Sequence, residues 1–328
     1  CLWDFCGLPP RAPDELTVEN RECMPGARWF PDSRINFANH LLTRQDDSPA
    51  IVFRSENVVR RVVSHADLYG QVAGIAAALR SMGVKAGDRV CGFMPNMPET
   101  ISAMLASASL GAIWSSCSPD FGVQGVLDRF GQIEPKVLFS ADGYFYNGSS
   151  HHSLDKLNAI RAGLPSLEKV VIAPLVTDRP DVSRITDGVL LEEFLVPTDS
   201  IEFENLPFNQ PLYIMYSSGT TGVPKAIIHG AGGTLLQHLK EHRLHADVHP
   251  GDRLFYFTTC GWMMWNWLVS GLASGAILGL YDGSPFYPDG NMLFDFVSEE
   301  KMNIFGTSAK FIDAANKAGI HPKETHDL

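Results

Sequence analysis

Short runs rich in β-branched and aromatic residues alternate along this chain with amphipathic helical runs. Helical patterns at 98–110 and 122–133 separate some of the strand-like runs. The predicted strands are 49–53, 58–63, 88–94, 111–116, 136–140, 168–173, 211–216, 253–257, 276–281 and 302–306. Regular alternation of strand and helix is typical of βα units that build a parallel sheet. The pattern therefore predicts an α/β fold in which helices flank mostly parallel sheets, and the proline-containing stretch 174–210 is expected to be an irregular crossover.

The first long helix carries clear start and stop signals. Ser64 precedes the helical pattern and Asp67 follows three residues later, which is the spacing of a capping box. Apolar residues then recur every three or four positions, and Gly83 supplies a stop signal. We expect a helix between Ser64 and Gly83.

A long uncharged stretch imitates a membrane span. No charged residue lies between Arg253 and Asp282, and the glycines inside are spaced as in paired membrane helices. An asparagine and two serines interrupt the stretch, however, and neither flank has a cluster of lysine or arginine. The pattern favours a buried helix over 262–274 and a buried strand over 276–281, divided at Gly275. We therefore expect no stable insertion in a membrane.

Composition limits the cellular compartments and the classes of partner that suit this protein. The 26 basic and 37 acidic residues give a net charge of −11, which disfavours a nucleic acid or an anionic membrane as the main partner. Six cysteines without a CxxC pair suit a reducing compartment, and the first thirty residues contain no secretory signal. A cytosolic (cytoplasmic) location follows as an expectation. Because the chain starts at Cys1 and stops at Leu328 just after a helical run, we expect a piece of a longer protein.

One histidine pattern resembles a zinc motif. His238 to His242 reads H-x-x-E-H, the signature of one group of zinc proteases, and His245 and His249 extend the same stripe. Two histidines four residues apart on a helix can bind zinc. A five-residue pattern arises often by chance, and no third ligand can be identified. We expect a solvated helix face and no metal site.

The most informative passage joins two β-rich runs between Tyr213 and Gly230. Its centre combines hydroxyls, glycines and one lysine at Ser217, Ser218, Gly219, Thr220, Thr221, Gly222 and Lys225. Glycines let backbone N–H groups approach an oxyanion closely, hydroxyls donate hydrogen bonds, and a lysine adds a mobile positive charge. The passage predicts a cradle for phosphate groups. A flexible Ser/Gly/Thr linker is the alternative, but linkers seldom lie between two apolar strands.

This cradle is not a P-loop of the Walker type. That motif has G-x-x-x-x-G-K-[ST] and opens a helix, whereas here Lys225 leads into another β-rich run. The phosphates would lie against a turn between two strands, without a helix dipole behind them.

The segment Ser217–Lys225 resembles the phosphate loop of the acyl-adenylate-forming superfamily. The passages 108–122, 126–136, 261–267 and 280–285 are more similar to the acetoacetyl-CoA synthetase family than to acetyl-CoA synthetases. The opening passage 28–38 resembles the N-terminal extension of the same group. The resemblance implies an extension over 1–48 and an incomplete AMP-binding domain over 49–328, about half of a family member.

The resemblance implies an acid–thiol ligase that uses ATP, Mg²⁺ and coenzyme A. Acetoacetate would form an acyl adenylate, and coenzyme A would then displace AMP. Lys225, Thr220 and Thr221 would carry the catalytic contacts, with one of these threonines at the edge of the Mg²⁺ site, and the whole set Ser217, Ser218, Gly219, Thr220, Thr221, Gly222 and Lys225 would bind the nucleotide.

The acyl pocket is expected at Gly261, Trp262, Trp265 and Asn266, where large aromatic walls suit a short acid. Trp262 and Asn266 could donate hydrogen bonds to a 3-oxo group. The alternative is that the tryptophans in this passage are core residues of a buried helix.

Some family motifs have no match in these residues. The later acidic Mg²⁺ ligand, the ribose-binding aspartate and the adenylation lysine are missing, and so are the arginines that acetyl-CoA synthetases place near coenzyme A. We therefore expect the chain alone to be inactive. Two alternatives stay open: another short-chain acyl-CoA synthetase, and a catalytically inactive regulatory or binding fragment.

Overall fold

Two β-sheets form the framework of the protein, in a computed structural model that describes residues 1–217 and 222–328. The larger sheet has seven strands in the order β12-β11-β8-β6-β7-β14-β15. Their bounds are Gly188–Leu190, Lys169–Ala173, Val137–Ala141, Arg89–Phe93, Ile113–Cys117, Pro211–Ser217 and Lys225–Gly230. All neighbours are parallel except β14 and β15, which form an antiparallel hairpin.

The smaller sheet has five strands in the order β18-β16-β17-β4-β5. Their bounds are Ile304–Gly306, Arg253–Tyr256, Ile277–Asp282, Pro49–Ser55 and Val59–Ser64. Only the pair β4 and β5 is antiparallel. Both sheets thus have the mixed, mostly parallel organisation that the alternating pattern predicts, and every long predicted strand is present.

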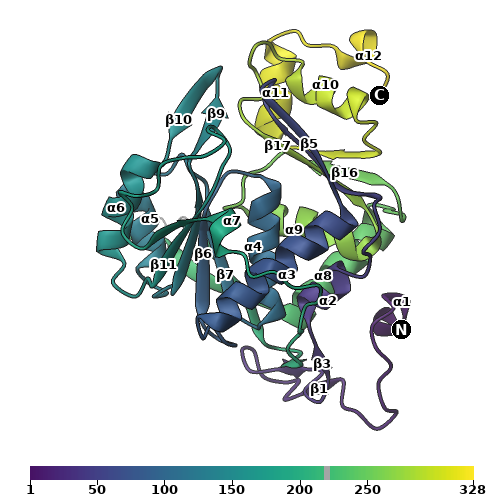
Figure 1. The fold of residues 1–328 in the computed structure, drawn as a ribbon. Coiled ribbons are helices and arrows are strands. Elements are labelled where there is room, and N and C mark those ends of the chain that lie inside the picture. Colours follow the sequence, from purple (N-terminus) through teal and green to yellow (C-terminus); the bar gives the residue numbers. More distant parts are fainter. Residues whose placement is uncertain (218–221) are drawn as a thin grey trace.

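Helices cover the sheets in layers (Figure 1). Between the two sheets lie α2 (Phe37–Leu41), α3 (His65–Ser81), α4 (Pro98–Ser109), α8 (Ala231–Lys240) and α9 (Met263–Val269). The outer face of the larger sheet packs on α5 (Val123–Phe130) and α6 (Leu154–Gly163). The outer face of the smaller sheet packs on α10 (Met292–Glu299) and α11 (Ala309–Lys317). Short helices are α1 (Leu2–Phe5), α7 (Leu191–Phe194) and α12 (Pro322–Thr325).

Local signals in the sequence set the ends of two elements. At the start of α3, the Ser64 side chain accepts a hydrogen bond from the Asp67 amide and the Asp67 carboxylate reaches back, so the predicted capping box is confirmed. Within the uncharged stretch, α9 and a 3₁₀ turn (Ser270–Ser274) end at Gly275, whose φ is +78°, and β17 follows. The predicted division into a buried helix and a buried strand is confirmed. Among the described residues, no helix is long and apolar enough to cross a membrane.

Three two-stranded ribbons complete the structure. The pairs are β1 (Val18–Glu19) with β2 (Arg28–Trp29), β3 (Arg34–Ile35) with β13 (Leu206–Pro207), and β9 (Gly143–Tyr146) with β10 (Ser149–His152). The β9–β10 hairpin projects from the larger sheet towards the C-terminal helices (Figure 1) and contacts β17. The stretch 174–210 is mostly irregular, as expected, but it also holds β12 and α7 at the sheet edge.

The first 48 residues share the central core with the rest of the chain. Trp3, Phe30 and Phe208 form an aromatic group, and the Arg11 guanidinium lies over Trp3 and Phe30. Phe37 is buried in the same hydrophobic cluster as both sheets. The division of the chain at residue 48 stays a prediction.

Two neighbouring glycines of α8 provide a matched test of this packing. A Cβ at Gly232 would overlap the Phe208 ring, whereas a Cβ at Gly233 would meet nothing within 4 Å. We expect Gly232→Ala to destabilise the protein by about 1–3 kcal/mol through overpacking. Gly233→Ala should be neutral or stabilise the helix by up to about 1 kcal/mol. Denaturant unfolding of the two variants measures the difference; equal stabilities would contradict the packing of α8 on Phe208.

Candidate functional site

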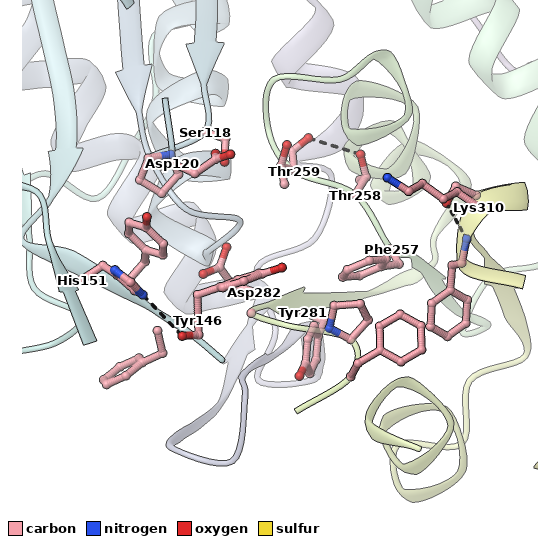
Figure 2. Close-up of a pocket in the computed structure, with 18 of the residues that line it drawn as sticks. Ser118, Asp120, Tyr146, His151, Phe257, Thr258, Thr259, Tyr281, Asp282 and Lys310 are labelled. Atoms are coloured by element: carbon pink, nitrogen blue, oxygen red, sulfur yellow. Dashed lines mark hydrogen bonds between the residues drawn. The ribbon is translucent and has the colours of Figure 1, made fainter. Parts of the chain in front are cut away.

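A cavity lies where parallel strands of the two sheets end. This cavity, of about 630 Å³, opens between the carboxyl ends of the two sheets (Figure 2). Its walls come from residues that follow β7, β16 and β18, from the end of β17 and from the β9–β10 hairpin. In open α/β sheets, ligands bind in crevices outside the carboxyl ends of the strands. This position makes the cavity a candidate binding site.

Aromatic and ionisable side chains line this cavity together. Tyr146, His151 and Asp120 lie on one side and Lys310 lies on the opposite side, with Asp282 between them (Figure 2). The other lining residues are Ser118, Pro119, Tyr144, Phe145, Phe257, Thr258, Thr259, Tyr281, Gly283, Pro285, Phe286, Ser308, Phe311 and Ala314. Such a concave, largely apolar site with a few polar groups suits a small organic molecule.

Asn96 ties the walls of the cavity together from behind. It follows β6, and its backbone N–H donates to Asp282 Oδ1 at 2.9 Å. Its side-chain amide donates to the carbonyl of Thr258 at 3.2 Å, and its Oδ1 accepts from Trp265 Nε1 at 2.9 Å. One buried residue of the larger sheet thus fixes β17, the loop after β16 and α9.

The Asp282 carboxyl has an unusual environment. Burial disfavours its charged form, and the nearby charges of Asp120 and Glu56 add to that effect, so its pKa rises from 3.8 to about 7. The hydrogen bond from Asn96 opposes the shift but does not cancel it. The raised pKa lets the protonated form of Asp282 persist to higher pH than in an ordinary carboxyl group, and that form can donate a hydrogen bond to a ligand.

The predicted phosphate loop connects β14 and β15 and follows the carboxyl end of β14 in the larger sheet. Ser217 and Lys225 are paired across the hairpin, and Lys225 is exposed. Gly222 has a φ of +94°, which favours glycine. Gln132 Nε2 donates to the carbonyl of Pro224 at 2.9 Å and fixes the returning strand to the end of α5. The two strands follow each other in the predicted order and pair antiparallel.

Four of the predicted site residues lie outside the described residues. They are Ser218, Gly219, Thr220 and Thr221. Their roles, and those of Ser217, Gly222 and Lys225 towards a nucleotide, remain predictions.

The predicted acyl segment packs beside the β14–β15 hairpin. Asn266 Nδ2 contacts Met215 Sδ at 3.2 Å on β14. Gly261 lies close to the backbone of Ser116 and Ser118, because the Ser116 hydroxyl donates to the carbonyl of Cys260 at 2.7 Å. The structure thus places the acyl segment against β14, the strand that precedes the predicted phosphate loop, although more than thirty residues separate that loop and the segment in sequence.

The three tryptophans of this segment have different environments. Trp262 is 70% exposed, whereas Trp265 and Trp267 are 0% and 8% exposed and belong to the central core. The Trp265 indole donates inward to Asn96, so it supports the site from behind and forms no open wall. Asn266 is 3% exposed, and its Oδ1 has no hydrogen-bond partner among the described residues. Core packing, the alternative weighed above, thus describes Trp265 and Trp267 but not Trp262.

A second cavity, of about 450 Å³, lies between α8 and the start of α9. His229, Thr234, His238 and Met263 contribute to its lining. This cavity borders the acyl segment, because its lining residue Met263 directly follows Trp262 in sequence. Two cavities therefore lie near the acyl segment, the first lined by Thr258 and Thr259 and the second by Met263.

Two histidines of the stripe, His238 on α8 and His242 in the π-helical turn that follows (Glu241–His245), face the protein interior. His245 and His249 are exposed. His238 Nδ1 lies 2.8 Å from Ser270 Oγ, and His242 Nε2 lies 3.1 Å from the carbonyl of Trp267. Burial lowers the pKa of His238 to about 3 and that of His242 to about 4. The expectation of a solvated helix face was wrong for these two residues, because α8 packs this face on the helical turn after α9. Among the described residues, no group of three or more His, Cys, Asp or Glu side chains could hold a metal ion.

Comparison with known proteins agrees with this architecture. Residues 38–328 match the family described as AMP-binding enzyme. This chain belongs to that family. An acetoacetyl-coenzyme A synthetase of Rhizobium meliloti (strain 1021) is 52% identical over 330 residues, and an acetoacetyl-CoA synthetase of Mus musculus is 48% identical over 339 residues. Both alignments cover the whole of this chain and 50% of the relative, so the chain spans about half the length of these relatives.

A solved structure supports the same assignment of fold. The structure of the acetoacetyl-CoA synthetase from Streptomyces lividans matches with a TM-score of 0.92 and 43% identity. The match covers 100% of this chain and 50% of that one. The fold is therefore that of the first half of an AMP-binding acyl-CoA synthetase, as the resemblance implied.

Reasoning from the sequence did not single out the larger cavity as a site. Ser118, Asp282 and Lys310 each come at or shortly after the end of a predicted strand, and that position is the signal that could have found them. The β9–β10 hairpin had no such signal, because each of its strands has only four residues.

The titration of Asp282 predicts a dependence of stability on pH. Between the ordinary carboxyl pKa near 4 and about 7, the folded protein binds a proton that the unfolded chain releases, so stability falls as the pH rises through this window. Asp282→Asn removes this titration and keeps an acceptor for Asn96. From pH 5 to pH 8 the parent should lose about 2 kcal/mol more unfolding free energy than the variant.

Denaturant unfolding at the two pH values measures this loss. The exposed Asp178 provides the control, and Asp178→Asn should show the same pH dependence as the parent. Parallel pH profiles for Asp282→Asn and the parent would show that Asp282 titrates normally.

Proposed function

We propose that the complete protein to which this chain belongs is an acetoacetate–CoA ligase. The observation that carries the proposal is the 52% identity to an acetoacetyl-coenzyme A synthetase along the whole chain. Two structural features support it: a hydroxyl-rich hairpin at the carboxyl edge of the larger sheet, and cavities beside it large enough for small organic ligands. The substrates would be acetoacetate, ATP and coenzyme A.

The first step would join the acid to the nucleotide. A carboxylate oxygen of acetoacetate forms a bond to the α-phosphorus of ATP, and pyrophosphate leaves. The acid is already ionised at neutral pH, so this step needs no general base. Negative charge develops on the phosphate oxygens, and preorganised donors stabilise it. We assign this role to the Ser217–Lys225 hairpin, with the Lys225 ammonium as its positive charge.

The second step would transfer the acyl group to sulfur. The thiol of coenzyme A loses its proton, its sulfur bonds to the acyl carbon, and AMP leaves with the electron pair of the broken C–O bond. The larger cavity lies beside the β7 end and the acyl segment, so it is well placed to receive one of the substrates.

Mg²⁺ would neutralise part of the triphosphate charge. In nucleotide enzymes this ion is held mainly by phosphates and water, with one or two protein oxygens. The hydroxyls of Thr220 and Thr221 have the oxygen chemistry that Mg²⁺ prefers, and they remain our candidates at its edge. We further propose a reducing, cytosolic environment, because all six cysteines are free.

Acid-dependent exchange of pyrophosphate into ATP tests the first step. The complete open reading frame should be expressed, because the relatives extend over about twice this length. We expect exchange with acetoacetate to exceed exchange with acetate, propionate and butyrate. Lys225→Ala should slow it by about 100-fold or more, and the 328-residue chain by itself should show none. Equal rates for all four acids would support a general short-chain synthetase, and a complete protein without exchange would contradict ligase activity.

The exposed indole of Trp262 offers a test of the acyl pocket. Replacing Trp262 by glycine removes a large wall, and we expect kcat/KM for butyrate relative to acetoacetate to rise about tenfold. Trp29 is the control, because it is also an exposed tryptophan, at 52%, but belongs to the N-terminal ribbon. Trp29→Gly should leave the ratio unchanged. An unchanged ratio for Trp262→Gly would reject its role in the pocket.

A further inference from the structure

A buried carboxylate holds two walls of the larger cavity together. Glu56 lies in the turn after β4 and is 1% exposed. Its Oε1 accepts hydrogen bonds from the amides of Asn147 at 2.7 Å and Ser284 at 3.0 Å, and its Oε2 accepts from the amide of Gly148 at 3.0 Å. Glu56 thus joins three loops that are distant in sequence.

The surroundings of Glu56 are built closely around its side chain. A Cβ at Gly283 would overlap Glu56 Cγ, and Gly283 has a φ of +134° that only glycine adopts easily. The Glu56 amide donates to the carbonyl of Asp282 at 3.1 Å. Glu56 itself has a φ of +42°, a left-handed conformation that costs free energy for a residue with a side chain.

No ion pair compensates this buried charge among the described residues; the three amides do so. Burying a carboxylate without a cation is costly, and strained backbone persists only where its surroundings enforce it. A structural link alone could use an apolar contact. The buried carboxylate and the strained backbone together therefore indicate that Glu56 has a more specific role than packing.

The two loops that Glu56 fastens carry the groups that face the cavity. Asn147 and Gly148 form the tip of the β9–β10 hairpin, whose strands carry Tyr146 and His151. Ser284 follows Asp282, and its carbonyl accepts a hydrogen bond from the Tyr281 hydroxyl at 3.0 Å. The Glu56 carboxylate therefore lies where these two walls of the cavity meet and binds both of them.

The base of the hairpin has an independent anchor. Asp142 is 1% exposed, and its carboxylate accepts hydrogen bonds from the amides of Leu175, Val176 and Thr177. The tip also packs on Tyr287, because its ring occupies the place where a Cβ at Gly148 would lie. Loss of the Glu56 contacts would remove the hydrogen bonds that hold the tip and so loosen it, while the base stays fixed. The hairpin would then move as a flap, and the cavity would change width.

We propose that Glu56 is a positioning residue for ligand binding: its carboxylate fixes the tip of the β9–β10 hairpin to the loop after β17 and thereby sets the width of the 630 Å³ cavity. The ligand is one of the three substrates, and in this respect alone the inference depends on the proposed function. Glu56 touches no reacting atom, so its effect should appear in binding and not in the chemical step.

Glu56→Gln and Glu56→Ala in the complete protein test the inference. Glutamine keeps one acceptor oxygen but turns an amide towards N–H donors, and alanine removes every contact. We expect the KM of one substrate to rise about five- to twentyfold in Glu56→Gln and more in Glu56→Ala, as one or two hydrogen bonds are lost. The KM of the other substrates and kcat per folded molecule should change by less than about threefold.

Glu300 provides the matched control. It is 4% exposed and pairs with Arg60, the second residue of β5, with Arg54 and Arg253 close by, and it contributes nothing to the lining of this cavity. Glu300→Gln should lower the melting temperature at least as much as Glu56→Gln while every KM stays unchanged. If Glu56→Gln lowers the melting temperature and alters no KM, Glu56 is a structural residue only and the inference fails.

Two further measurements separate this inference from the proposed function. Hydrogen exchange at the amides of Asn147 and Gly148 should accelerate in Glu56→Gln, whereas exchange at Val176 should not. Titration calorimetry with ATP and with coenzyme A reports binding without turnover. A parent protein that binds one of them more tightly than Glu56→Gln, yet turns over no acid, would contradict the ligase but support the role of Glu56. If the parent binds neither ATP nor coenzyme A, or if exchange at Asn147 and Gly148 is unchanged in Glu56→Gln, the proposed role of Glu56 is wrong.

Discussion

The structure depends on the way in which its two sheets meet at their carboxyl ends. Parallel strands end in loops whose polar groups are not satisfied by the sheet, and here the loops of both sheets converge on one region. Buried polar groups must find hydrogen-bond partners. Asn96 and Glu56 satisfy this requirement. Asn96 comes shortly after β6 and Glu56 comes after β4, and each binds loops from elsewhere in the chain. The apolar helices between the sheets set their separation, and these polar contacts align their ends.

This arrangement explains why the candidate site lies in a cavity and not on a surface. The side chains between the sheets are buried up to the ends of the strands, and the 630 Å³ cavity lies beyond those ends. Asp282 lies at that boundary, where burial raises its pKa but the cavity keeps it accessible to a ligand. The β14–β15 hairpin, which carries the predicted phosphate loop, begins two strands away from β6 in the same sheet, so the hairpin and the cavity share one scaffold.

The acyl segment illustrates how one sequence pattern divides in space. Trp262 and Trp265 are three residues apart, yet one is largely exposed and the other is fully buried with its N–H bound to Asn96. α9 begins immediately after Trp262, so the helix turns the two indoles in different directions. Aromatic residues within one short segment therefore have different environments: Trp265 belongs to the core, and Trp262 is exposed.

The sequence by itself determined the features that depend on near neighbours. The capping box at Ser64, the break at Gly275 and the order of strands and helices all rest on contacts within about fifteen residues. The β14–β15 hairpin was also predictable, because its strands adjoin in sequence and turn chemistry marks their junction.

Only the tertiary structure decided which polar residues matter together. Glu56 bonds to amides 91, 92 and 228 residues away, and Asn96 bonds to Asp282 across 186 residues. The inward orientation of His238 likewise depends on a serine 32 residues away. No periodicity or spacing encodes such partners, because the crossovers between parallel strands bring them together only when the whole chain has folded.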